Sequence, residues 1–375
     1  MSSTAIHTGT SAGVSARSSS AAAADDQPTT ILTPASRRFV PTDLQGKPIP
    51  HAQRWAYSTA AVARGRVGSQ AVNVVAIALF VLWQRSATAH ALYAHLDSTY
   101  GAAAVNVWGT FAITSVFFWV WGGVFALADL TGRPRWLFRY KTQPFVRVPA
   151  REYAWICLVS LRNQVCGALP MTLVTLLLPA SPVHPGAVPG AARTVATFLF
   201  DVGCAEAGFY YIHRAFHSRA LYARFHKKHH EFTAPVGLAA TYCTLTEHVL
   251  SNLLPNALGT VLLPHHWSQQ CFAFLFLEFS TVCAHSGYNV PGLPSNLHHD
   301  FHHFAFDENF SPTGLLDRLH GTDAKYVATL REAMARTDGD EERARKLVMQ
   351  RLAQIEVAAD EAKARAKAKA KTGEK

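Results

Sequence analysis

The sequence has few charged residues for its size. Charged residues make up 16% of its 375 positions, and apolar residues make up 49%. A typical soluble domain carries about 25% charged residues. This shortage argues against an ordinary cytosolic enzyme and favours a protein that contacts lipid over much of its surface.

The six cysteines are few, and their spacing excludes two kinds of site. No two of them form a C-x-x-C pair, and most lie inside apolar runs. We interpret them as small buried hydrophobic residues, not as a disulfide framework or a zinc knuckle. The N-terminus lacks a charged segment followed by an apolar one, so we expect no secretory signal peptide.

The positive charge is not accompanied by any nucleic-acid recognition motif. The formal net charge is +10, and half of this excess lies between Lys363 and Lys375, where six basic residues stand against one acidic residue. Such a tail suits solvation or an anionic membrane surface. We therefore expect the bilayer as a partner and no nucleic acid.

Four regions follow one another along the chain. Residues 1–50 are rich in Ser, Ala, Thr and Pro and are predicted to be disordered. Residues 51–194 are predicted to hold transmembrane helices, and residues 195–323 are predicted to form the catalytic region, which contains the histidine clusters. Residues 324–375 are rich in Ala, Arg, Glu and Lys, which predicts a basic helical tail.

Four apolar runs are long enough, or nearly so, to cross a bilayer, which takes about 20 residues. These runs are Val67–Trp83, Val105–Ala128, Tyr153–Pro179 and Val195–Ile212. Two later runs, Val249–Leu263 and Cys271–Cys283, are short for crossings and predict a shallow hairpin or buried helices. The fold class is therefore all-α, an integral membrane protein with about four transmembrane helices.

Basic residues indicate how the chain is oriented. They precede the first run and follow the second and fourth, whereas the loops 84–104 and 180–194 hold one each. By the positive-inside rule, the N-terminus and the segment after the fourth run face the cytosol. We expect a cytosolic helical cap on two membrane hairpins. The alternative is a soluble protein with buried helices.

Histidine is the residue in excess. The chain has 19 histidines, and thirteen of them fall between positions 213 and 303. Three clusters stand out: an H-x-x-x-H at His213 and His217, an H-x-x-H-H at His226, His229 and His230, and a second H-x-x-H-H at His299, His302 and His303. On a helix, positions i and i+4 lie on one face, about 5–6 Å apart. Eight imidazoles exceed one tetrahedral site and fit two adjacent metal ions.

The donor set narrows the choice of metal. Imidazole suits iron, zinc, copper and nickel. Structural zinc sites in cytosolic proteins are normally completed by cysteine, and no cysteine lies at ligand spacing here. Carboxylate di-iron proteins repeat a Glu-x-x-His motif, which is absent. A histidine-rich di-iron site is the best fit. The pair His265 and His266 follows Pro264 and is interpreted as interfacial, not as ligands.

The clusters HRAFH, HKKHH and HDFHH resemble those of the fatty acid hydroxylase/sterol desaturase superfamily of integral membrane di-iron enzymes. The resemblance covers roughly Asp129–Asp323. It extends to the stretches FHKKHHEFTAPVG, AHSGYNVP, HHDFHHFAFDENFSP, LLDRLHGTD and RYKTQP, which resemble sterol C-4 methyl oxidases. The resemblance implies a cytosolic catalytic cap in the endoplasmic reticulum membrane. It also implies electrons from NAD(P)H through cytochrome b5 and its reductase.

The resemblance also implies the ligand set. All eight cluster histidines match ligand positions, and they are the residues expected to carry catalysis. His285, in the His-Ser-Gly-Tyr stretch, resembles a ninth ligand; its alternative role is to cap an apolar helix. One departure concerns residues 242–247, where many sterol-oxidising relatives have Tyr-Ala-His-Pro-x-Glu. Thr244 replaces the histidine here, and His248 is either a substitute ligand or a polar neighbour of Glu247.

The expected reaction is hydroxylation of an unactivated lipid C–H bond, with two iron ions, O2 and two electrons. A 4-methyl sterol is the first expected substrate, and a fatty acyl or sphingoid chain is the second. Asp300, Glu247 and Glu278 are candidates for orienting the ligands. Aromatic residues near the clusters either line an apolar pocket or pack: Phe209, Tyr210, Tyr211, Phe225, Phe301, Phe304 and Phe306. Alternatives from other classes are a non-catalytic metal-binding or transport protein, an inactive regulatory member and a zinc-dependent lipid hydrolase.

Overall fold

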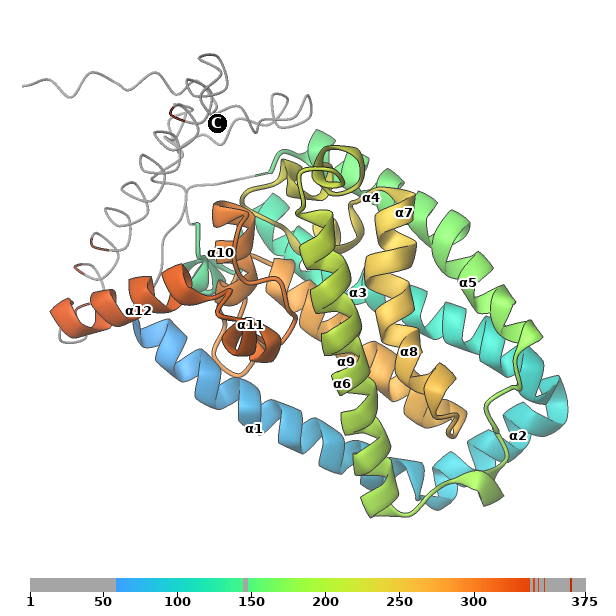
Figure 1. Cartoon of the computed structure of the whole chain (residues 1–375). Coiled ribbons are helices and arrows are strands. Elements are labelled where there is room, and N and C mark those ends of the chain that lie inside the picture. The colour runs from blue at the N-terminus through green and yellow to red at the C-terminus, as the bar shows by residue number, and fades with distance from the viewer. Residues whose placement is uncertain are drawn as a thin grey trace, which may run out of the picture.

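The computed structural model describes residues 59–143 and 148–337, together with four single residues in the C-terminal segment. The expected disordered segment 1–50 and most of the predicted tail helix lie outside these residues. The part that is described is all helical, and it has no β-strand apart from an isolated bridge between Lys141 and Tyr288 (Figure 1). The predicted all-α class is confirmed.

The N-terminal half opens with two helices that meet at a capped turn. Helix α1 spans Thr59–Gln84, and α2 spans Ala87–Ala104. The Ser86 side chain caps α2 by accepting a hydrogen bond of 3.1 Å from the backbone N–H of Ala89. The expected loop over 84–104 is therefore wrong. This segment is rich in alanine, the strongest helix former, and it begins with a favourable cap.

The next helices form the long apolar elements. A π-helical turn, Val105–Gly109, joins α2 to α3 (Thr110–Thr131). Helix α4 (Ala150–Asn163) continues through a π-helical turn at Gln164–Ala168 into α5 (Leu169–Val174). Helix α6 (Ala191–Phe216) follows and is 26 residues long.

Three of these stretches are long and apolar enough to cross a membrane. They are Ala87–Thr131, Ala150–Leu177 and Ala191–Phe216. The first expected run corresponds to a shorter apolar helix, Gln70–Gln84. Large apolar side chains such as Val116, Val120 and Leu127 are more than 60% exposed, which suits contact with lipid. The chain is a membrane protein, and three such helices lie among the described residues. The expected number of four crossings stays a prediction.

The two shorter apolar runs form helices that pack against the longer ones. Helix α7 (Leu245–Glu247) leads through a π-helical turn at His248–Leu253 into α8 (Leu254–Leu262). Helix α9 spans Trp267–His285 and packs against α3. Helix α8 lies directly beside α6 (Figure 1).

Gly259 allows the close approach of α8 to α6. A Cβ atom at this position would lie 2.3 Å from Oδ1 of Asp201 on α6. No side chain larger than hydrogen fits there without moving one helix. The expectation of buried helices is met by α9, which has ten buried residues, whereas α8 packs on α6 and leaves Leu254, Val261 and Leu262 exposed.

Three small helices complete the described chain and form a layer at one end of the bundle: α10 (Leu297–Ala305), α11 (Leu315–His320) and α12 (Ala324–Thr337). The segment around Lys141 holds this layer in place. Lys141 forms a buried ion pair with Asp129, which also accepts hydrogen bonds from Tyr153 (2.7 Å) and Tyr288 (2.6 Å). The segment continues to Gln143, which donates to Asp300 of α10 at 3.1 Å.

Candidate metal centre

Nine histidines from five segments converge in two adjacent groups. Within each group, one ring nitrogen per histidine lies within 4.8 Å of the others. The first group contains His213, His217, His226, His230 and His302, and the second contains His229, His285, His299 and His303. The structure thus brings together all nine histidines singled out in the sequence.

Each group is assembled from helix ends and short turns. His213 lies in the last turn of α6 and His217 is the C-cap of that helix, so the two rings face one direction with centroids 5.0 Å apart. His226 ends a π-helical turn (Tyr222–His226). His285 is the last residue of α9. The ligands His217, His226 and His285 therefore lie at the C-terminal ends of helical elements.

The two H-x-x-H-H motifs are each divided between the groups. Nε2 of His226 lies 2.9 Å from Nε2 of His230, and both belong to the first group, whereas His229 joins the second. The motif on α10 is divided in the opposite sense, since His299 and His303 join the second group and His302 joins the first. In each motif the first and last histidines (i and i+4) lie on one face and join the same group, whereas the middle histidine (i+3) joins the other group. Each motif therefore ties the two groups together.

The spacing of the nitrogens fits coordination of a transition metal. Nε2–Nε2 separations run from 2.9 Å between His285 and His299 to 3.3 Å between His229 and His285. With metal–nitrogen bonds of about 2.1 Å, neighbouring ligand atoms lie roughly 3 Å apart and opposite ones roughly 4.2 Å apart. Nε2 of His302 is buried and has no hydrogen-bond partner among the described residues. A lone pair in this environment suits a cation.

Backbone carbonyls fix the orientation of four rings. In each case the Nδ1 atom donates to a carbonyl oxygen, which leaves Nε2 as the electron-pair donor. The pairs are His213 with Phe310 (2.7 Å), His302 with Glu308 (2.7 Å), His303 with Phe232 (3.0 Å) and His285 with Thr281 (2.8 Å). The rings are thereby held before any ion binds.

Glu247 orients a fifth ring. Its Oε1 atom lies 2.7 Å from Nδ1 of His226, an arrangement typical of metal-binding histidines. Thr244 positions Glu247, because its side chain caps α7 by accepting the N–H of Glu247 at 3.2 Å and donates to the carbonyl of Phe225 at 2.8 Å. This Thr-x-x-Glu sequence matches the start of a capping box. Thr244 therefore has a structural role in this chain.

The other two carboxylates considered from the sequence lie elsewhere. Asp300 is buried on α10 and accepts hydrogen bonds from Gln143 and Asn296. Glu278 lies on α9 in the wall of a cavity between the helices. Of the three candidates, Glu247 is the one whose contact with a clustered histidine is clear.

Burial keeps the clustered imidazoles neutral. Loss of hydration lowers the pKa of these side chains, and the positive charge of any protonated neighbour would lower it further. The pKa falls well below the usual value for His217, His226, His229, His230, His299, His302 and His303. Burial also lowers the pKa of His285 to about 4. The neutral ring is the form that binds a metal.

The remaining histidines and aromatic residues do not join the groups. His248 lies in the wall of the cavity, and the pair His265 and His266 is buried, not interfacial. Phe301 and Phe304 pack in a small hydrophobic core against α12. The ring of Phe306 lies 5.0 Å from that of His230. Phe301 and Phe304 therefore serve packing, whereas Phe306 lies against a clustered histidine.

Sequence reasoning missed two carboxylates that support the centre. Asp317 is fully buried and accepts the backbone N–H groups of Phe310 (2.8 Å) and Ser311 (2.7 Å). Glu206, within α6, accepts the N–H groups of Thr313 (3.0 Å) and Leu316 (3.0 Å). Together they hold the loop whose carbonyls orient two ligands. An acidic residue inside an apolar run was the available signal for Glu206.

Comparison with known proteins identifies relatives over most of the chain. The fatty acid hydroxylase family model matches residues 198–322. The chain is 33% identical to "Fatty acid hydroxylase ahd1" of Mycosarcoma maydis over 310 residues, covering 81% of this chain and 80% of that protein. It is 34% identical to human "Fatty acid hydroxylase domain-containing protein 2", covering 59% and 68%.

A third relative carries a sterol-related name. The chain is 28% identical to "Methylsterol monooxygenase 1" of Danio rerio over 259 residues, covering 62% of this chain and 82% of that protein. No solved structure matches.

Proposed function

Because this chain belongs to the fatty acid hydroxylase family, we propose that it is a membrane-bound di-iron monooxygenase that hydroxylates a lipid C–H bond. The nine histidines are the metal ligands in this proposal, and the eight cluster histidines carry catalysis. The observation that carries it is the convergence of nine imidazoles, seven of them buried, in two adjacent groups.

The donor set supports iron over zinc. Five and four imidazoles exceed the three protein ligands of a typical catalytic zinc site. Iron accepts higher coordination numbers with nitrogen donors and is redox-active. When bound, two iron ions would use O2, two electrons and two protons to place one oxygen atom in a C–H bond and release the other as water.

The residues of the chain prepare this site in three ways. Carbonyls and Glu247 fix the Nδ1 protons, so the Nε2 atoms point inward as lone-pair donors. Burial excludes water from the centre and keeps the rings neutral. The helix α6 carries His213 at the end of a membrane-spanning stretch, so the centre lies where a lipid can reach it without leaving the bilayer.

We propose a sterol, with oxidation at a 4-methyl group, as the first substrate class. The name of the methylsterol monooxygenase relative supports it. A fatty acyl or sphingoid chain is the second candidate, supported by the name of the fungal fatty acid hydroxylase relative. The proposal includes electrons from NAD(P)H through cytochrome b5 and its reductase. It also places the enzyme in the endoplasmic reticulum membrane with the centre on the cytosolic side.

Metal analysis and lipid profiling test the proposal together. Full-length protein purified in detergent is expected to carry about two iron ions per chain, and alanine at His302 is expected to abolish both iron binding and turnover. Cells lacking the gene are expected to accumulate 4-methyl sterols, which expression of the wild-type chain removes. An unchanged sterol pool with altered hydroxylated acyl chains would favour the second substrate.

Dependence on O2 separates the proposal from the other classes of function. Product formation should stop without O2 and should incorporate one labelled oxygen atom from 18O2. A zinc-bearing protein that releases product without O2 would be a hydrolase. Iron-bearing protein that turns over neither lipid class with the electron-transfer partners present would contradict the enzymatic proposal.

A further inference from the structure

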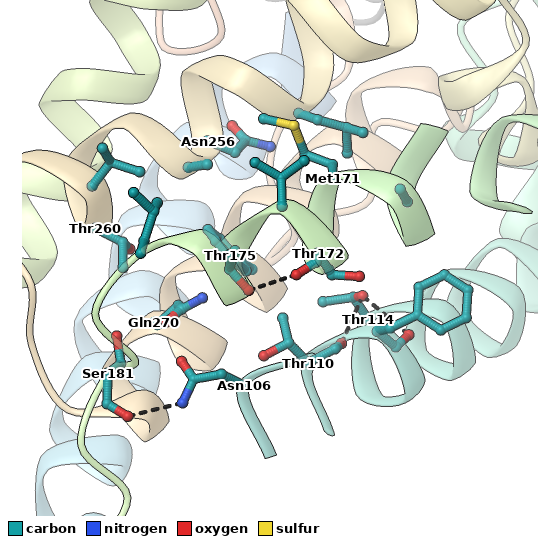
Figure 2. A pocket seen from close by; sticks show the side chains of 18 of the residues that line it. Asn106, Thr110, Thr114, Met171, Thr172, Thr175, Ser181, Asn256, Thr260 and Gln270 are labelled. Carbon is teal, nitrogen blue, oxygen red and sulfur yellow. Dashed lines mark hydrogen bonds between the residues drawn. The ribbon is translucent and has the colours of Figure 1, made fainter. Parts of the chain in front are cut away.

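A cavity of about 270 Å³ lies inside the membrane part of the bundle, among α3, α5, α8 and α9. Figure 2 shows polar side chains from several of these helices directed into it, including Asn106, Thr114, Thr260 and Gln270. Ligand sites of drug size usually occupy about 300–1,000 Å³. The cavity thus suits one section of a lipid molecule.

Several polar atoms in the cavity wall are buried without a hydrogen-bond partner among the described residues. They are Nδ1 and Nε2 of His248, Oγ1 of Thr241, Oε2 of Glu278, Oγ1 of Thr260 and Oε1 of Gln270. His248 is 3% exposed, and both of its ring nitrogens lack a hydrogen-bond partner in the described part of the chain. Unpaired polar groups are costly in an apolar environment, so their presence around one cavity indicates a polar ligand group.

The backbone around the cavity has an unusual feature in common. The described residues contain four π-helical turns, a rare conformation that is frequent at functional sites. One of them ends at His226. Each of the other three contributes to the cavity wall, through Asn106, Gln164 and His248 respectively. Three of the four π-helical turns therefore occur at segments that contribute polar side chains to the cavity wall.

His248 connects the cavity to the metal centre. Its neighbour Glu247 contacts His226 of the first group, while His248 itself faces the cavity. Gly167 leaves room for the imidazole, because a Cβ atom at that position would lie 3.0 Å from Cδ2 of His248. The residue that lines this end of the cavity, His248, is therefore next in sequence to Glu247, which orients the predicted metal ligand His226.

We propose that His248 binds the hydroxyl group of the lipid substrate, so that the cavity selects a lipid alcohol whose hydroxyl lies close to the carbon that is oxidised. This inference rests on the proposed function. A neutral imidazole offers one donor and one acceptor, and a hydroxyl group is both. A ring alcohol with a methyl group on the adjacent carbon, as in a 4-methyl sterol, meets this requirement. A plain acyl chain brings no hydroxyl to this end.

Ligand binding by the iron-loaded, full-length protein in detergent micelles tests the inference. The probes are a 4-methyl sterol with a free 3-hydroxyl group, its 3-deoxy analogue and palmitic acid. The wild type is expected to bind the alcohol about 10- to 100-fold more tightly than the deoxy analogue, because the analogue leaves buried polar atoms unpaired. Palmitic acid is expected to compete weakly.

Substitutions assign the discrimination to His248. The variant His248→Phe keeps an aromatic ring without polar atoms and is expected to bind the alcohol and the deoxy analogue equally. The variant His248→Gln keeps a donor and an acceptor and should retain part of the preference. As a matched control, Met171→Leu changes an apolar side chain of the cavity wall at nearly constant volume, and it should leave the preference unchanged.

The outcomes separate this inference from the proposed function. Equal binding of the two sterols by the wild type, or a preference that survives in His248→Phe, would overturn the role of His248 even if lipid turnover persists. Absence of iron or of O2-dependent turnover would instead contradict the proposed function. Iron content near the wild-type level in His248→Phe would show that this variant is folded. Its lost preference for the alcohol would then reflect altered ligand recognition.

Discussion

Asp317 provides a sharp test of how the loop supports the metal centre. Its two carboxylate oxygens accept four hydrogen bonds and it is fully buried. Oδ1 accepts from Phe310 N (2.8 Å) and Thr322 Oγ1 (2.6 Å), and Oδ2 accepts from Ser311 N (2.7 Å) and Ser311 Oγ (2.7 Å). The carbonyl of Phe310 in turn orients His213. The substitution Asp317→Asn changes one oxygen to an NH2 group without changing the shape.

The size of the effect of Asp317→Asn depends on which hydrogen-bond partners of the carboxylate can adapt to an NH2 group. The Ser311 hydroxyl can rotate and accept from the new NH2 group, but the backbone N–H of Ser311 cannot. A buried donor left unpaired costs about 1–3 kcal/mol. Because the loop also positions His213, we expect iron affinity to fall about 10- to 100-fold, the usual effect of losing a partner that orients a ligand.

The assay is iron retention against a chelator of known affinity, together with thermal unfolding in detergent. The matched control is Asp307→Asn in the same loop, where the carboxylate is 59% exposed and pairs with an exposed Lys325. An exposed pair contributes about 0–1 kcal/mol, so the control should retain its iron. If Asp317→Asn bound iron as tightly as the control, the Phe310 carbonyl would not be what holds His213.

Three further predictions concern other parts of the structure. Glu247→Gln should weaken iron binding about 10- to 100-fold while leaving the helix content unchanged, as measured by chelator competition and circular dichroism; unaltered affinity would remove Glu247 from the site. Gly259→Ala should destabilise the protein by about 1–3 kcal/mol in thermal unfolding, because its Cβ would lie 2.3 Å from Asp201 Oδ1; a variant as stable as the wild type would contradict the tight packing of α8 on α6. Burial lowers the pKa of His285 from its usual value of 6.5 to about 4, so the metal-free protein should be fully stable above pH 6.5 and lose stability as the pH falls towards 4; a flat stability profile over that window would refute a buried neutral ring.

The sequence alone was sufficient to find the histidines but not their arrangement. Repetition of H-x-x-H-H is visible in the chain, and His285 emerged from the surrounding His-Ser-Gly-Tyr stretch. The division of each motif between two groups depends on the short helix α10 and on the turn at His229, which are set by tertiary packing. A local pattern reports which residues share a face, and it does not report what lies opposite that face.

The fold shows the same division between local and tertiary information. The apolar runs predicted the membrane helices, because length and hydropathy are properties of a segment. Low apolar content relative to its neighbours predicts a loop over 84–104, but the high helix propensity of its alanine residues makes most of it a helix. The cavity was not predictable, since its wall combines polar residues from four separate segments without a shared motif.

The charged residues inside the apolar runs also have an explanation within the chain. Arg162 donates to the carbonyl of Cys243 (2.9 Å), and Asp201 pairs with His265 (3.1 Å). Glu206 accepts two N–H groups from the loop that supports the metal centre, and it lies seven residues before His213 on one face of α6. A transport path would need such groups to face a continuous opening. Here each one binds a neighbouring segment instead, and Glu206 links α6 to the loop that supports the histidine centre.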